Sequence, residues 1–125
     1  MVKSTISLIV VGMIIALACV WESWFIKSNF NDFYNVVQTT YLKVENQTAT
    51  QDDVYSLQKN WLEKKKVLHT VIPHSEIKEV DLWVSETVKL VANKQWPDAL
   101  SKLEVLKELS EQIPRSFSLL PENIL

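Results

Sequence analysis

A run of uncharged residues near the N-terminus constrains the architecture of this chain more than any other feature. No charged residue lies between Lys3 and Glu22, which leaves 18 residues, Ser4 to Trp21. As a helix this run is about 27 Å long, since each residue adds ~1.5 Å, and the hydrocarbon core of a bilayer is roughly 30 Å thick. Aromatic residues at its far end suit the membrane interface. We therefore predict an N-terminal transmembrane signal-anchor over residues 1–26.

The charge that precedes this run predicts its orientation. Lys3 lies before the apolar residues, and positive residues tend to stay on the cytoplasmic side. We expect a single-pass protein of the cell membrane, with a cytoplasmic N-terminus and an extracytoplasmic C-terminal domain. Lys27 on the other side of the run weakens this bias.

Two alternatives would convert the same run into a removable signal. Ile15-Ala16-Leu17-Ala18-Cys19 loosely resembles a bacterial lipobox, which would leave a lipoprotein-like tether on Cys19. Ala16 and Ala18 also form an Ala-x-Ala pattern, which predicts simple cleavage after Ala18. Against both, the helical pattern continues beyond the cut without a break. We favour Cys19 as an ordinary small apolar residue of a membrane helix.

The scarcity of glycine limits the folds open to the chain beyond the anchor. Gly12 is the only glycine, and it lies inside the apolar run. Phosphate-binding loops, dinucleotide fingerprints and tight hairpins depend on glycine, so their absence is expected. We predict an all-α fold in which the transmembrane helix continues into an antiparallel bundle of about four helices joined by short loops.

Apolar residues at steps of three and four place these helices in the sequence. The first continues to about Glu45, the second runs from the predicted cap Thr50 to about Val71, and the third runs from about Glu76 to Asn93. The fourth runs from Pro97 to about Ile113, where Pro114 is expected to stop it. His74 or Ser75 is expected to cap the third helix. The predicted units are a helical bundle at 27–113 and a C-terminal tail at 114–125.

The predicted core consists of one apolar stripe on each helix. The stripes contain Phe30, Phe33, Val37, Tyr41 and Val44, then Val54, Leu57, Trp61, Leu68 and Ile72, then Ile77, Val80, Val84, Val88 and Val91, then Leu100, Leu103, Leu106 and Ile113. Leu42 and Leu82 are expected to widen the stripes of the first and third helices.

The charge balance argues against nucleic acid as a partner. Residues 28–125 contain 11 Lys and Arg and 14 Asp and Glu, a net charge of −3, which is no footprint for a polyanion. The triplet Lys64-Lys65-Lys66 could bind anionic lipid or nucleic acid. We favour a solvated helix face whose charges complement the helix dipole. One cysteine excludes an internal disulfide and a cysteine-based zinc site.

Two groups of side chains are candidates for ligand binding. His69 and His74, with Glu76 and Glu79 nearby, could hold a cation, although the histidines are five residues apart and do not share a helical face. The favoured alternative is one capping histidine and one on a helix face. Trp61, Trp83 and Trp96 could line a pocket, but large core residues at helix contacts are the favoured interpretation. We predict no catalytic, cofactor or metal residues.

Several strings resemble a known family. The segment KVENQTATQDDVYSLQKNWLEKKKVLHTVIPHSEIKEVDLWVSE and the segment KQWPDALSKLEVLKELSEQIPRSF are similar to the bacterial family called domain of unknown function 4363. The resemblance implies a small, membrane-anchored helical protein of spore-forming Gram-positive bacteria, whose genes often accompany YetF-like membrane proteins. It carries over no active residue.

These observations predict a protein that acts by contact. We expect a non-enzymatic accessory or structural subunit of a bacterial membrane complex, with the lipid bilayer and a YetF-like membrane protein or a second copy as partners. The alternative is an extracytoplasmic module that senses a ligand or cation.

Overall fold

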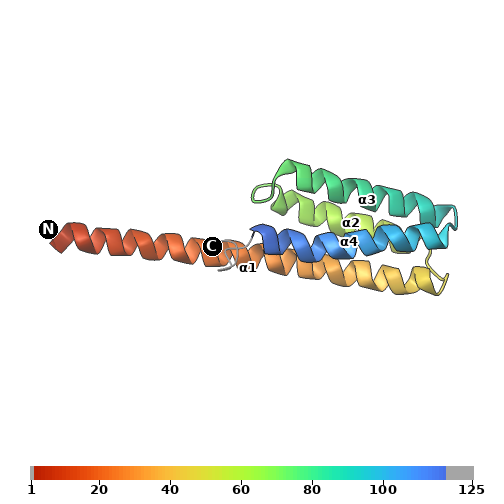
Figure 1. Cartoon of the computed structure of the whole chain (residues 1–125), viewed down its shortest axis with the longest axis horizontal. Helices are drawn as coiled ribbons and strands as arrows, with labels where there is room; N and C mark the ends of the chain where they lie inside the picture. Colours follow the sequence, from red (N-terminus) through yellow and green to blue (C-terminus); the bar gives the residue numbers. More distant parts are fainter. Residues whose placement is uncertain (1, 118–125) are drawn as a thin grey trace.

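The computed structural model describes residues 2–117 and contains four helices in that range, α1 (Val2–Glu45), α2 (Gln51–Leu68), α3 (His74–Ala92) and α4 (Trp96–Phe117). No strand occurs among the described residues. The second half of α1 packs with the other three helices, and its first half projects from the bundle as a straight rod (Figure 1). The predicted all-α fold, with one long N-terminal helix entering a bundle, is confirmed.

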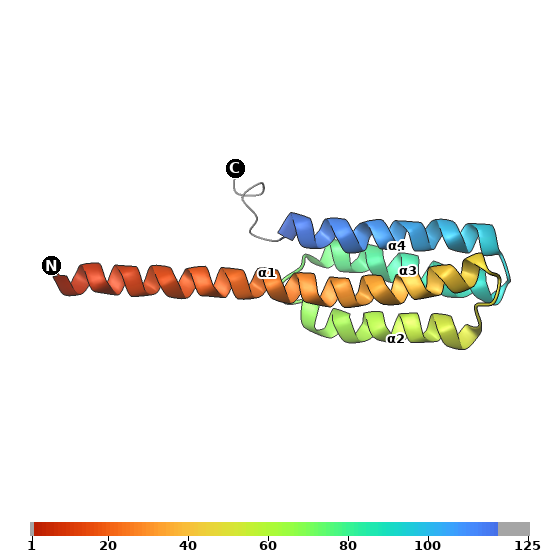
Figure 2. The ribbon, with the colours of Figure 1, turned by 90° about the horizontal axis from the view of Figure 1, so that it is seen from below.

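The helices alternate in direction around the bundle. α1 packs mainly against α2 and α4, and α3 packs against the same two helices. The connections α1–α2 and α3–α4 therefore lie at the end far from the projecting rod (Figure 2). The α2–α3 connection and the last turn of α4 lie at the near end, beside the middle of α1. This placement puts residues from all four helices around the base of the rod.

The predicted apolar stripes form the core. Phe30, Leu57, Val80 and Leu103 represent the four helices, and each is at most 1% exposed. Trp61 is the largest fully buried side chain, and its ring contacts those of Phe30 and Phe33. The prediction fails at Leu42 and Leu82, which are 48% and 54% exposed. Both lie at the edge of a stripe, where a small rotation of the helix turns a side chain to solvent.

Three buried hydroxyl residues are absent from the predicted core. Thr40, Thr87 and Ser110 are 3%, 0% and 5% exposed. Each donates a hydrogen bond to the backbone carbonyl four residues earlier, at 2.7–2.9 Å. Since burial of a hydroxyl is costly only when it lacks a partner, these bonds allow small polar residues inside the bundle.

The start of α2 follows its prediction closely. The Thr50 side chain accepts a hydrogen bond from the backbone N–H of Asp53, and the Asp53 side chain accepts one from the backbone N–H of Thr50. This reciprocal capping box satisfies two donors that the helix cannot pair internally. The sequence pattern therefore located this helix start to the residue.

The turn between α2 and α3 differs from its prediction. α2 ends at Leu68, whereas the pattern predicted Val71, and α3 begins at His74, two residues before Glu76. Pro73 occupies the N-cap position, and no side chain caps α3. The expected cap by His74 or Ser75 is therefore wrong, because both residues already belong to the first turn.

The predicted stop at Pro114 is also wrong. α4 begins at Trp96 and continues through Pro114 to Phe117. A proline removes one helical hydrogen bond and crowds the preceding turn. Here Pro114 is buried, and Ile113 and Phe117 pack against the core, so burial stabilises the last turn despite that loss. Residues 118–125, most of the predicted tail, lie outside the described residues.

The α1–α2 and α3–α4 connections end their helices with the same backbone arrangement, at a position that glycine usually occupies. Gln47 and Lys94 have φ values of 58° and 57°, in the left-handed region. In each loop two backbone bonds close the helix, for example from Lys94 to Val91 and from Gln95 to Leu90. This is the Schellman arrangement, in which a side chain at the left-handed position is strained. A bundle without glycine therefore tolerates strain at both turns.

Candidate functional site

The projecting half of α1 exposes a long run of apolar side chains. Its large apolar side chains, from Val2 to Trp24, are 47–73% exposed. One window of 18 residues in this helix is long and apolar enough to cross a membrane, and none of that window is buried by the rest of the chain. Length and composition alone would also suit a signal sequence. Because none of the window is buried, this segment is not a core helix of its own bundle.

Cys19 lies within this unbroken half of α1. It is a free cysteine of intermediate exposure, with helical residues on both sides. A continuous helix through Ala18 and Cys19 fits a signal-anchor without further assumption. Lipidation of Cys19 and cleavage after Ala18 stay the two alternatives to the predicted anchor.

A groove of about 940 Å³ opens between α1 and α4 at the base of the projecting half. α1 contributes Trp24 and Lys27 to it, and the last turns of α4 contribute Glu111 and Arg115. Trp24 is 63% exposed. The antiparallel course of α4 brings its C-terminal end beside a residue about 90 positions earlier, a juxtaposition that no local pattern predicts.

A second groove, of about 630 Å³, brings the two histidines together. His69 from the end of α2 and His74 from the start of α3 both line it, together with Leu62 and with three lysines, Lys59, Lys65 and Lys66. The turn at Pro73 makes this possible although the residues lack a common helical face. The sequence groups the two histidines because they are close in the chain, and it does not predict a groove.

The composition of this second groove disfavours a cation. Glu63 is its one carboxylate among the lining residues, and the predicted partners Glu76 and Glu79 do not line it. Among residues 2–117, no group of three or more His, Cys, Asp or Glu is placed to hold a metal ion. Lysine side chains nearby would repel a cation, so the groove is chemically better suited to an anion.

The three tryptophans of the bundle lie in separate packing environments. Trp61 is buried and donates a hydrogen bond from Nε1 to Asp81 at 2.6 Å. Trp83 is half-buried, and the Lys102 ammonium lies 4.7 Å from its ring centroid. Trp96 packs partly against the core at the start of α4. The interpretation as a core residue is confirmed for Trp61, whereas Trp83 and Trp96 are partly buried and pack against the core from its edge.

The lysine triplet is engaged in cross-helix contacts. Lys64 forms an ion pair with Asp32 of α1, and Lys65 forms one with Asp81 of α3 at 2.7 Å. Lys66 is exposed and lines the histidine groove. Lys65 and Lys66 lie in the last turn of α2, as the predicted dipole complement requires, and Lys64 and Lys65 also pair with carboxylates on neighbouring helices.

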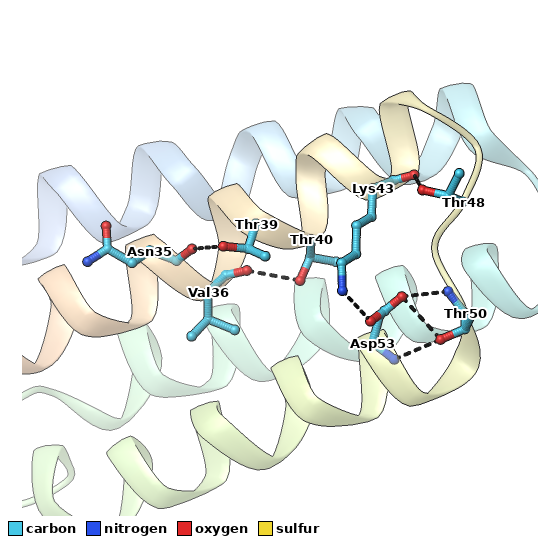
Figure 3. A network of polar contacts seen from close by, with 8 residues as sticks. All are labelled: Asn35, Val36, Thr39, Thr40, Lys43, Thr48, Thr50 and Asp53. Atoms are coloured by element: carbon cyan, nitrogen blue, oxygen red, sulfur yellow. Dashed lines mark hydrogen bonds and ion pairs between the residues drawn. The ribbon is translucent and has the colours of Figure 1, made fainter.

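A polar network joins α1 to α2 at the far end of the bundle (Figure 3). The Lys43 ammonium donates to Asp53 at 2.7 Å, and Asp53 also accepts from the Thr50 backbone at 2.8 Å. The Lys43 hydrogen bond, followed by the Thr50 backbone bond, lowers the pKa of the Asp53 carboxyl below its ordinary value, which outweighs the opposing effect of desolvation. This network holds the start of α2 against the end of α1.

The family model called domain of unknown function 4363 matches residues 25–124. The chain belongs to the DUF4363 family. The match begins at Phe25, so the shared region is the bundle, and the apolar half of α1 precedes it. Neither the curated proteins nor the solved structures contain a match to this chain. The predicted family is therefore confirmed, and the family description adds no activity.

Proposed function

We propose that this DUF4363 protein is a single-pass, membrane-anchored accessory or structural subunit that acts through contacts and not through catalysis. The observation that carries the proposal is the exposure of the apolar half of α1, whose large side chains are 47–73% exposed. Burial of such a side chain is favourable by roughly 1.5–3 kcal/mol, so a long run of them would not stay in water. Lipid tails and a partner helix are the two environments that would cover them.

The orientation proposed for the chain follows the charge at its start. Lys3 would hold the N-terminus on the cytoplasmic side, and the bundle would lie outside the cell. An engineered cysteine tests this orientation in a Cys19→Ser background. Lys94→Cys, at the far end of the bundle, is expected to react with an impermeant thiol reagent in intact cells. Val2→Cys is expected to react only after permeabilisation, and the reverse pattern would overturn the orientation.

The proposed partner is a membrane protein, of the YetF-like kind that the family resemblance suggests, or a second copy of this chain. The exposed apolar half of α1, next to a helical bundle, favours such a role, because a partner helix could pack on it within the bilayer. The test is purification of the tagged full chain in mild detergent, with cross-linking in the membrane beforehand. A specific membrane protein or a homo-oligomer is expected. A monomer without any cross-linked companion would overturn the subunit role while leaving the anchor intact.

A second candidate function is a ligand-sensing module. The observation that favours it is the groove that His69 and His74 share with three lysines. Thermal shifts of the full chain in detergent, measured with divalent metals and with small anions, would test it. A shift with an anion that is lost in His69→Gln would favour sensing, and no shift with any compound would remove this candidate.

A further inference from the structure

We infer that the groove between α1 and α4 binds the phosphate of an anionic phospholipid in the leaflet that faces the bundle. The inference rests on the proposed membrane anchor. It concerns the groove lined by Trp24, Lys27 and Asn31 of α1 and by Glu111 and Arg115 of α4, with a volume of about 940 Å³.

The depth of the groove matches the headgroup layer. The uncharged run ends at Trp21, and a helix rises ~1.5 Å per residue, so Trp24 lies about 5 Å and Lys27 about 9 Å beyond it. The headgroup layer on each side of a bilayer is roughly 5–7 Å thick, so Trp24 lies within it. The Lys27 backbone lies about 2 Å outside it, a distance that the flexible lysine stem can span. α4 ends beside α1 at this level, where the projecting half begins (Figure 2). The groove would therefore open sideways into the headgroups.

The chemistry of the lining suits a phosphate. Lys27 and Arg115 are exposed cations, and a guanidinium can bind phosphate oxygens in a bidentate manner. Asn31 is also exposed and adds a neutral donor group. An indole such as that of Trp24 prefers the boundary between apolar and hydrated regions. Together these side chains provide charge, directed hydrogen bonds and an apolar wall.

Two negative contributions oppose the anion. Glu111 lines the groove, and the C-terminal end of α4 carries roughly half a negative charge from its helix dipole. Arg115, in the last turn of α4, offsets the dipole, and Lys27 comes from another helix and adds a full positive charge. Glu22, at a similar depth on α1, does not line the groove. Among the lining residues that the structure describes, the side-chain charge is positive, and removal of Glu111 would increase it.

The neighbouring surface indicates a lipid as the source of the phosphate. The apolar half of α1 begins directly below the groove, with Val20 and Trp21 at 67% and 60% exposure. Acyl chains lying along these side chains would hold the attached phosphate within reach of the Lys27 ammonium. A free phosphate ion would gain no such contact, so a diacyl lipid is the better fit.

The experiment compares lipids at the protein surface. The full chain is reconstituted in phosphatidylcholine bilayers, and electron paramagnetic resonance measures the motionally restricted fraction of spin-labelled phosphatidylglycerol and phosphatidylcholine. We expect a several-fold preference for phosphatidylglycerol. Lys27→Gln and Arg115→Gln each remove one cation. Each should lower the preference for phosphatidylglycerol by roughly fivefold, or abolish it where the starting preference is smaller than that, as expected for one charge near an anionic surface. Glu111→Gln should raise the preference.

The control variant carries Lys94→Gln, which removes the same single positive charge at the exposed far end of the bundle. It should keep the preference of the unmodified chain. An equal preference in all variants would overturn the groove, as would displacement of the labelled lipid by millimolar inorganic phosphate. If the unmodified chain fails to float with pure phosphatidylcholine vesicles, the anchor itself fails. Flotation without any lipid preference overturns the groove alone.

Discussion

The indole Nε1 of Trp61 donates a 2.6 Å hydrogen bond to Oδ1 of Asp81, which links the largest buried side chain of α2 to α3. The other oxygen of the same carboxylate accepts from Lys65 at 2.7 Å. One carboxylate thus satisfies both a core indole and a cation of the lysine triplet. It is the clearest polar link between these two helices.

Loss of this carboxylate should destabilise the bundle. In Asp81→Ala the buried indole N–H lacks a partner, and such a loss costs about 1–3 kcal/mol. Asp81→Asn keeps an acceptor for the indole and should cost less. The measurement is urea unfolding of the full chain in mild detergent, followed by the near-ultraviolet dichroism of the tryptophans. Glu79→Ala, an exposed change on the same helix, is the control, and equal stability of all three variants would contradict the prediction.

The capping box should contribute measurably to α2. Thr50→Ala removes the acceptor for the Asp53 backbone N–H, and loss of an N-cap costs about 1 kcal/mol. Thr50→Ser retains the hydroxyl and should be close to the unmodified chain. The same unfolding measurement compares them. If the alanine and serine variants were equally stable, the cap would be irrelevant to the fold.

Acid should weaken the far end of the bundle through Asp53. Its pKa is lowered in the folded state, chiefly by the Lys43 hydrogen bond, so its contribution to stability is present above the unfolded-state pKa of about 4. That contribution is lost as pH falls through the lower folded-state pKa. The free energy of unfolding, measured across this range, should therefore drop. Asp53→Asn should flatten that part of the profile, and an unchanged profile would refute the assignment.

The left-handed residue at the end of α3 offers a stabilising change. Lys94 has a φ of 57°, a conformation that costs a residue with a Cβ atom roughly 1 kcal/mol. Lys94→Gly should relieve part of this strain and raise the midpoint of thermal unfolding. Lys94→Ala removes the same charge and keeps the Cβ atom, so it separates the two effects. If Lys94→Gly unfolded at a lower temperature than Lys94→Ala, the prediction that the left-handed position is strained would be wrong.

Local patterns predicted the features of this fold that depend on neighbouring residues. The apolar period located the stripe that contains Leu57 and Trp61, and the spacing of Thr50 and Asp53 located the start of α2, because each depends on one turn of helix. Pro114 was misjudged because its place in α4 depends on burial against other helices. The hydroxyl of Thr87 was missed because its backbone bond, and not its polarity, decides whether it can be buried.

The candidate grooves could not be predicted in the same way. Lys27 and Arg115 meet only because α4 runs antiparallel beside α1, and His69 meets His74 only because the chain turns at Pro73. The sequence supplied both histidines as candidates without the groove that joins them. It offered no signal for the pairing of Lys27 with Arg115, since residues so far apart share no periodic pattern.

The role of the projecting half of α1 can be tested by one charge at its centre. Ile14 is 60% exposed on this half, so the bundle would not be disturbed by its replacement. An arginine at the centre of a membrane helix costs about 2.5–3.5 kcal/mol on insertion scales. Ile14→Arg should therefore shift much of the full chain out of the carbonate-resistant membrane fraction, as measured by blotting of fractionated cells. Leu42→Arg is the matched control, because Leu42 is also exposed but lies beside the bundle at 48% exposure. It introduces the same charge and should leave the fractionation unchanged. If both variants stayed equally in the membrane, the uncharged run would not be what holds the protein there.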